Sequence, residues 1–261
     1  MKANLLTIFT LWQRELVRFY RQPSRVVGAL GSPLLFWVVI GSGLGRSFRT
    51  GDSPMNYLEY FFPGTILMIL LFTAIFSTIS LIEDRREGFF QSVLVAPVSR
   101  ASIVLGKILG GATLALTQAC LFLLLGPLVG VALSAIQMIQ VTGVLFLCAF
   151  SLTGLGFLIA WQFNSVQGFH AIMNLVLMPL WLLSGALFPA GGAFGWVQGI
   201  MKINPLSYQN DALRQILFPV YFKNLGGATL SLCLTVTVFF AAATFMASVL
   251  AASAPNKETI K

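Results

Sequence analysis

The sequence predicts an all-α, polytopic membrane protein with six transmembrane helices, an N-terminal amphipathic interfacial helix and short re-entrant helices before the last span. Two observations predict this class. Hydrophobic residues make up 57% of the 261 positions and charged residues only 9%, whereas soluble domains have about 25% charged residues. Six apolar segments are also long enough to cross a bilayer, which takes roughly 20 residues. We expect these segments to form a single transmembrane domain over residues 1–261.

Residues 1–25 have the pattern of a helix that lies on the membrane surface. Apolar and basic residues recur at helical spacing on two different sides: Leu5, Ile8, Phe9, Trp12, Leu16 and Phe19 on one, and Arg14, Arg18, Arg21 and Arg25 on the other. Such a helix buries its apolar side in the bilayer interface while its basic side faces anionic headgroups. Pro23 is expected to break this helix before the first span.

The six candidate spans are residues 26–44, 60–82, 102–131, 137–161, 168–188 and 228–250. The third is longer than a bilayer requires, and Gly126, Pro127 and Gly130 predict that it bends or ends early. An even number of spans places both termini on one side of the membrane. With that side cytoplasmic, the outer loops hold few of the basic residues: Arg46, Arg49, Lys202, Arg214 and Lys223. This distribution follows the positive-inside rule, which also explains the net charge of +8 without a nucleic-acid partner.

The connection over residues 189–227 is too apolar for a solvated loop and too interrupted for a span. We expect it to form short external helices that re-enter or lie on the outer leaflet, shielded by protein. Asp211 and Arg214 are three residues apart and are expected to pair on one of these helices.

A cluster of charges dominates the loop after the second span. Glu83, Asp84, Arg85, Arg86 and Glu87 are consecutive, and we expect them in water because a single charge at the centre of a membrane helix costs about 3 kcal/mol. Apolar residues from Phe89 to Val95 then predict a short amphipathic helix at the membrane face, which ends before Pro97. A new helix is expected to begin near Ser99 or Ser102, with Arg100 and Lys107 near its aqueous end. Residues 83–98 form either a docking element for another protein or an ordinary polar connection.

The sequence excludes several kinds of chemistry. No phosphate-binding pattern G-x-x-x-x-G-K-[ST] occurs, and GSGLGRS at Gly41 resembles it only superficially. One His and three Cys, scattered through apolar segments, supply no metal cluster and no catalytic nucleophile with a base. The central portions of the predicted spans hold no Asp, Glu, Lys or Arg, which argues against a transporter driven by an ion gradient. We therefore expect no enzyme activity, metal or cofactor on this chain.

Three stretches identify a family resemblance. They are RELVRFYRQPSRVVGALGSPLLFWVVIGSGLG from Arg14, YLEYFFPGTILMILLFTAIFSTISLIEDRREGFFQSVLVAPVSRASIVLGKILGG from Tyr57, and LSGALFP together with NPLSYQNDALRQIL toward the C-terminus. The chain resembles the permease subunits of type-2 ATP-binding-cassette exporters, in particular those similar to daunorubicin-resistance and nodulation-factor export permeases.

This resemblance implies a half-transporter of the cytoplasmic membrane that pairs with a second permease, as a homodimer or heterodimer, and is driven by two copies of an ATPase that binds ATP and magnesium. It implies export of an amphipathic drug, lipid or glycolipid. It places ATPase coupling at Glu83, Asp84, Arg85, Arg86, Glu87, Gly88 and Phe89. An elbow helix carrying Arg14, Glu15 and Arg18 is implied near the same interface.

Two alternatives remain at this point: a secondary transporter driven by an ion gradient, and a membrane scaffold that transports nothing. The substrate and the residues that contact it stay open.

Overall fold

A computed structural model describes residues 2–45, 55–222 and 227–253, and all regular structure in these ranges is helical. The long helices are α1 (Lys2–Tyr20), α2 (Pro23–Leu44), α3 (Tyr57–Arg86), α5 (Arg100–Leu123), α6 (Ala135–Ala160), α7 (Val166–Trp181) and α11 (Leu230–Ser253). The shorter ones are α4 (Phe89–Val95), η1 (Gly126–Val129), η2 (Leu182–Ala186), η3 (Ala190–Gly192), α8 (Gly195–Ile203), α9 (Pro205–Leu217) and α10 (Pro219–Phe222). Arg46, Arg49 and Lys223, predicted in outer loops, lie outside the described residues.

Six helices of the described chain are long and apolar enough to cross a membrane, namely α2, α3, α5, α6, α7 with η2, and α11. The predicted six spans are therefore confirmed by length and composition. Helix α3 continues through Arg86, four residues beyond the predicted end at Ile82. It can do so because the charges in its last turn have ionic partners, described below.

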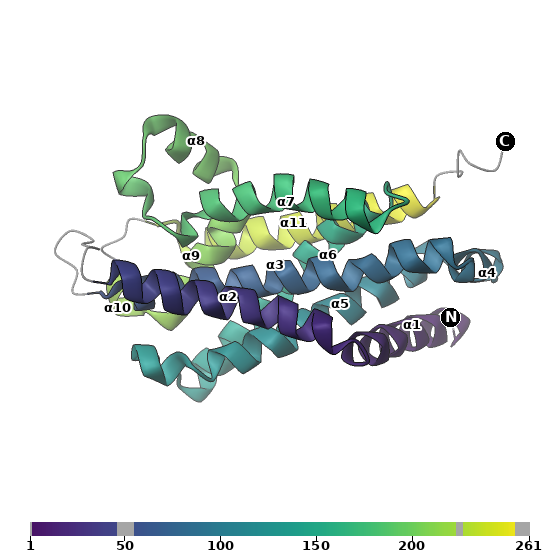
Figure 1. The fold of residues 1–261 in the computed structure, drawn as a ribbon, viewed down its shortest axis with the longest axis horizontal. Helices are drawn as coiled ribbons and strands as arrows, with labels where there is room; N and C mark the ends of the chain where they lie inside the picture. Colours follow the sequence, from purple (N-terminus) through teal and green to yellow (C-terminus); the bar gives the residue numbers. More distant parts are fainter. Residues whose placement is uncertain (1, 46–54, 223–226, 254–261) are drawn as a thin grey trace.

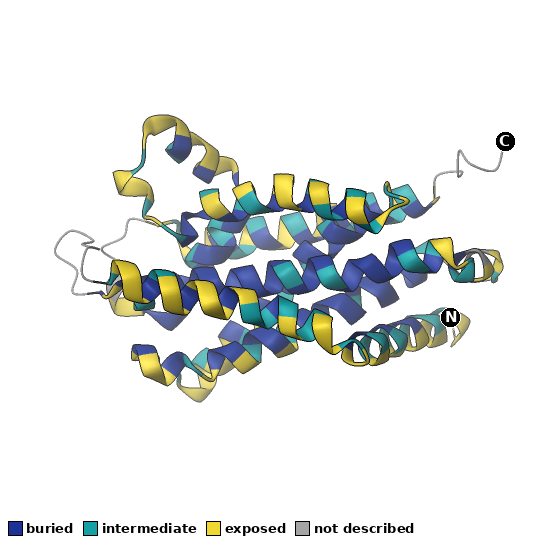
Figure 2. Ribbon diagram, viewed as in Figure 1, coloured by how far each residue is buried: buried dark blue, intermediate teal, exposed yellow. Residues whose placement is uncertain are grey.

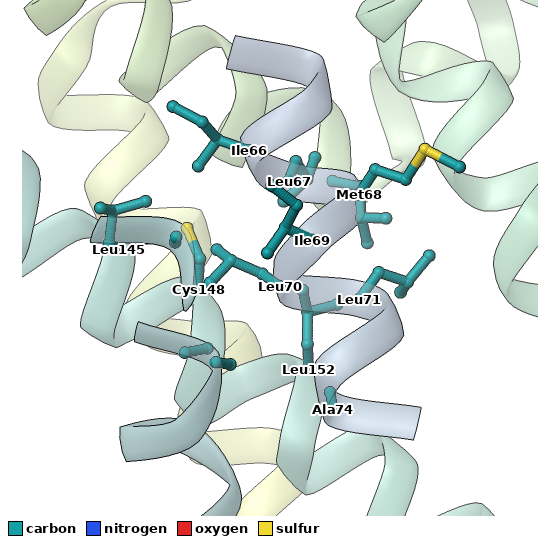
Figure 3. Close-up of a cluster of buried hydrophobic side chains, with 14 of the residues drawn as sticks. Ile66, Leu67, Met68, Ile69, Leu70, Leu71, Ala74, Leu145, Cys148 and Leu152 are labelled. Carbon is teal, nitrogen blue, oxygen red and sulfur yellow. The ribbon is translucent and has the colours of Figure 1, made fainter. Parts of the chain in front are cut away.

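Helix α3 is the centre of the bundle and runs along its whole length (Figure 1). Its side chains are buried on every side, whereas α2 and α11 alternate between buried and exposed residues (Figure 2). In the middle of α3, Ile66–Leu71 point outward in all directions, and Leu145, Cys148 and Leu152 of α6 lie against them (Figure 3). A helix that is apolar all round is suited to such a position.

Small residues allow the helices to approach closely. A Cβ atom added to Gly111 of α5 would lie 2.6 Å from both Ser77 Oγ of α3 and Thr153 Cγ2 of α6. One added to Gly154 would lie 2.8 Å from Thr244 Oγ1 of α11. Because lipid tails are as apolar as the side chains, helices in a bilayer associate through this kind of close packing.

The third span is shorter than the segment that predicted it. Ser99 caps α5 by accepting a hydrogen bond from the Ser102 backbone N–H at 3.2 Å. The helix ends at Leu123, and the short helix η1 follows before Gly130 reverses the chain with a φ of 72°. The predicted early end near Gly126 is thus confirmed. The reversal occurs at Gly130 because Gly adopts positive φ at little cost.

A sharp corner connects α7 to the segment that begins at residue 189. Gly185 has a φ of 76°, and its carbonyl accepts hydrogen bonds from Tyr60 Oη at 2.7 Å and from Arg214 Nη2 at 2.6 Å. Trp181 Nε1 also donates to the Gly64 carbonyl of α3 at 2.8 Å. These bonds fix the corner and α9 against α3. Helices α8 and α9 lie at the end of the bundle opposite α1 and α4 (Figure 1).

Candidate functional site

The predicted coupling region forms a helix end, a turn and a short helix. Glu83–Arg86 make the last turn of α3, and Glu87 caps that helix. Gly88 has a φ of 77° and reverses the chain into α4 (Phe89–Val95). Side chains other than Gly are strained at this φ, so the geometry of the turn depends on the glycine.

The expectation that all five charges lie in water is wrong for Asp84, which has no exposed surface. Arg14 of α1 donates to both of its carboxylate oxygens, at 2.6 and 2.7 Å, and Arg18 donates to Oδ1 at 2.6 Å. Lys107 Nζ of α5 donates to Oδ2. Such charge-assisted bonds, paired from one guanidinium, are the strongest hydrogen bonds that side chains make. The three cations take the place of water around Asp84, and this allows its carboxylate to be buried.

A second buried acid extends this network. Glu15 of α1 is 3% exposed and accepts from Lys107 Nζ at 2.5 Å and from Ser80 Oγ at 2.5 Å. Lys107 thus lies between two carboxylates, from α1 and α3. A buried ion is tolerated only with such complete pairing, since removing one partner leaves an uncompensated charge.

Glu83 joins a third connection to the same cluster. Its carboxylate accepts from Arg18 Nη2 at 2.9 Å and from Arg25 Nη2 at 2.5 Å. Arg25 belongs to α2, because α1 ends at Tyr20. The basic side of residues 1–25, expected to face an anionic leaflet, therefore directs Arg14, Arg18 and Arg25 toward acids of α3. The hydrogen bonds to Asp84 are the main reason why the pKa of Arg14 is raised, and burial acts in the opposite direction.

The remaining predicted coupling residues divide into two groups. Arg85 donates to the Trp161 carbonyl at 2.5 Å, and the Phe89 ring lies beneath the Arg14 guanidinium at 3.8 Å. In contrast, Arg86 is exposed, and the Glu87 side chain is 62% exposed with Arg18 3.7 Å away. The structure thus brings Glu83, Asp84, Arg14, Glu15 and Arg18 together in one network and leaves Arg86, Glu87 and the turn at the surface.

Sequence reasoning missed the role of Lys107 and Ser80 in this network. A signal was present: after Arg100 at the start of its helix, Lys107 is the only charge in an apolar run, next to Gly106 and three residues before Gly110. A Cβ atom added to Gly110 would lie 2.6 Å from Glu15 Cβ, so the glycine permits α1 to contact α5. An isolated cation beside small residues indicates a close helix contact with an acidic partner.

Comparison with known proteins identifies the family of the chain. A family profile described as ABC-2 type transporter matches residues 7–218, which include most of α1, the charged network, α4 and the segment through α9. The chain belongs to the ABC-2 type transporter family.

Relatives of this ABC-2 chain include several permeases. It is 29% identical to ycf38 of Cyanophora paradoxa, which is named as a transport permease, over 79% of this chain and 72% of the relative. Nodulation protein J of Rhizobium meliloti is 25% identical over 92% of each chain. The daunorubicin resistance ABC transporter permease protein DrrB1 of Streptomyces coeruleorubidus is 24% identical over 81% of this chain and 74% of the relative.

The chain is therefore the permease subunit of an ABC-2 exporter and a multi-pass membrane protein. ABC-2 permeases work with ATPase subunits and have no nucleotide-binding site of their own, so this chain is not itself an enzyme.

Proposed function

We propose that this ABC-2 permease moves an amphipathic drug, lipid or glycolipid out across the cytoplasmic membrane, with both chain termini on the cytoplasmic side. It pairs with a second permease subunit and is driven by two copies of a separate ATPase, which carry the ATP and magnesium. The names of the nodulation and daunorubicin resistance relatives support a substrate of this kind.

The ATPase docks at the turn formed by Arg86, Glu87 and Gly88, together with the exposed side of α4. The observation that carries this assignment is the continuity of α3. This single helix of 30 residues ends at the exposed turn and is buried through the middle of the bundle. A displacement of the turn is therefore transmitted directly to the core, because close-packed interiors transmit strain.

Glu83 and Asp84 act in coupling by joining helices rather than by contacting the ATPase. Through Arg14, Arg18 and Lys107 they tie α1 and α5 to the last turn of α3. Motion of the docking turn consequently moves α1 and the beginning of α5 along with α3. We therefore assign Asp84 this role of joining helices and not a direct contact with the ATPase, because its side chain has no exposed surface.

Two further regions take the roles expected from the sequence. Helix α1 is the interfacial elbow: its outer side exposes Leu5, Leu6 and Phe9 by 63%, 66% and 55%, as a lipid-facing surface would. Phe194, just before helix α8, and Trp196 within it are exposed, while Val197 of α8 is buried. This division supports a helix that lies on the outer leaflet with one side against protein.

The docking assignment is tested by exchanging the two exposed charges. The double variant Arg86→Glu/Glu87→Lys keeps the net charge and reverses the local pattern. We expect it to lose complex formation with the ATPase and substrate-stimulated ATP hydrolysis in lipid, while membrane insertion and thermal stability remain those of the unaltered chain. Full ATPase binding and hydrolysis by this variant would show that the turn is not the docking site.

A further inference from the structure

A small cavity is lined by residues of η2, α8 and α9. These elements lie at the end of the bundle opposite α4 (Figure 1). The volume of the cavity is about 200 Å³, below the roughly 300 Å³ at which pockets for drug-sized ligands begin. Arg214 and Ser184 form a buried floor, and Lys202 and Ala190 lie at the exposed rim. The space therefore suits a headgroup-sized ligand rather than a whole amphipathic substrate.

The guanidinium of Arg214 is buried, and the groups that it contacts most closely are neutral. The residue is 5% exposed, and its Nη2 donates to the Gly185 carbonyl at 2.6 Å and to the Tyr60 carbonyl at 3.5 Å. The Tyr60 ring lies 4.0 Å from the guanidinium carbon. Within the described part of the chain, Arg214 Nε has no hydrogen-bond partner. These contacts position the cation without neutralising it.

Asp211 is a weak counter-ion for Arg214. The closest approach of its Oδ1 to Arg214 Nη1 is 4.0 Å, and its Oδ2 accepts a hydrogen bond from the Ala228 backbone N–H at 3.2 Å. Burial raises the pKa of Asp211 although Arg214 acts in the opposite direction. Among the described residues that line the cavity, Lys202 and Arg214 are basic and Asp211 is acidic. The cavity therefore has an excess of positive charge.

We infer that this cavity binds a phosphate group, supplied either by an anionic lipid headgroup or by a soluble phosphate compound. Phosphate oxygens accept from guanidinium donors in the geometry that arginine presents, and such bonds are strengthened by the opposite charges. Arg214 Nη1, whose nearest acidic oxygen is Asp211 Oδ1 at 4.0 Å, supplies such a donor at the floor, and the Lys202 ammonium closes the rim. The inference goes beyond the export role, and it requires no ATPase.

The test uses the full-length chain in lipid nanodiscs without an ATPase, so its result does not depend on the docking proposed above. Three conditions are compared: phosphatidylcholine alone, equal parts phosphatidylcholine and phosphatidylglycerol, and phosphatidylcholine with inorganic phosphate against chloride at matched ionic strength. The unfolding midpoint Tm is followed by tryptophan fluorescence. We expect Tm to rise with the anionic lipid, with inorganic phosphate, or with both.

Three variants connect this shift to the cavity. Lys202→Gln should raise the ligand concentration needed for half of the Tm shift by roughly threefold, as for one solvent-exposed ion pair. Asp211→Asn should lower it, because the fixed negative charge is removed while the amide oxygen can still accept from the Ala228 N–H. Lys2→Gln is the matched control, since it removes one exposed cation at the other end of the bundle. Arg214 is kept because it holds the corner at Gly185.

A Tm shift with phosphatidylglycerol but not inorganic phosphate assigns the site to a lipid headgroup. A shift with inorganic phosphate but not phosphatidylglycerol assigns it to a soluble ligand, and a shift with both shows that the cavity accepts phosphate from either source. The absence of any Tm shift overturns the inference. The inference is also overturned if Lys202→Gln, Asp211→Asn and Lys2→Gln all change the half-effective ligand concentration equally.

Discussion

At the scale of single residues, Asp84 has the most demanding environment in the described chain. Its carboxylate is fully buried and is held by cations from α1 and α5. Replacing a whole buried ion network by apolar residues can be nearly neutral, whereas removing one member leaves the others uncompensated. The importance of Asp84 for folding therefore follows from its partners rather than from its own charge.

We predict that Asp84→Asn lowers the free energy of unfolding by about 3 kcal/mol, because Arg14, Arg18 and Lys107 lose a shared counter-ion. Chemical unfolding in detergent micelles measures this change. The matched control is Glu87→Gln, one turn along the chain, whose side chain is 62% exposed. It should cost less than about 1 kcal/mol. Equal losses for the two variants would contradict the buried network.

At the scale of helices, the contact between α1 and α5 determines where the elbow lies. Gly106 and Gly110 present a flat surface, against which Leu11 and Glu15 of α1 pack directly. Trp12 Nε1 donates to Thr113 Oγ1 at 3.0 Å on the same side of α5. The polar pairs form only because the two helices approach this closely.

We predict that Gly110→Leu separates α1 from α5, since even its Cβ atom would lie 2.6 Å from Glu15 Cβ. Breaking the Glu15–Lys107 pair should lower the free energy of unfolding by about 3 kcal/mol or more. Thr117→Leu adds a leucine to an exposed position of the same helix and is the control, for which we expect little change. Unfolding curves of both variants in the same micelles provide the measurement. Similar stability of the two variants would show that the helix contact is not tightly packed.

At the scale of the whole molecule, α4 lies at one end of the bundle, and α8 and α9, which line the cavity, lie at the other (Figure 1). The helices between them have lengths that match a bilayer. If the docking turn is cytoplasmic, the cavity between α8 and α9 faces the outside. The docking turn would then move on the cytoplasmic side of the membrane, and the cavity would bind its ligand on the outer side.

This orientation predicts the labelling of two exposed positions, Val95 on α4 and Ile203 on α8, which are 85% and 84% exposed. In intact cells, a membrane-impermeant maleimide should modify Ile203→Cys and leave Val95→Cys unmodified. In inside-out vesicles the pattern should reverse. The unaltered chain, with Cys120, Cys148 and Cys233, is the background control. Labelling of both introduced cysteines from the same side would contradict the topology.

Much of the architecture could be predicted from the sequence. The bilayer imposes a length on every apolar helix, so the number of spans could be counted from the long apolar runs. The early end of the third span was indicated by Gly126 and Pro127. Helical spacing indicated an amphipathic N-terminal helix, and Pro97 with Ser99 marked the boundary between α4 and α5. These are local properties, set by the hydrophobicity and backbone preferences of neighbouring residues.

Only the tertiary structure decided which charges face water. Asp84 and Glu87 are three residues apart in the same cluster, yet one is buried by cations from α1 and α5 and the other is exposed. Likewise, Asp211 and Arg214 form the expected i, i+3 pair on α9, at 4.0 Å, but only the tertiary structure places this pair in the lining of a cavity beside the corner at Gly185. Electrostatic partners in these sites come from segments far apart in the chain. Their pairing therefore depends on distances that close packing sets and that local sequence does not contain.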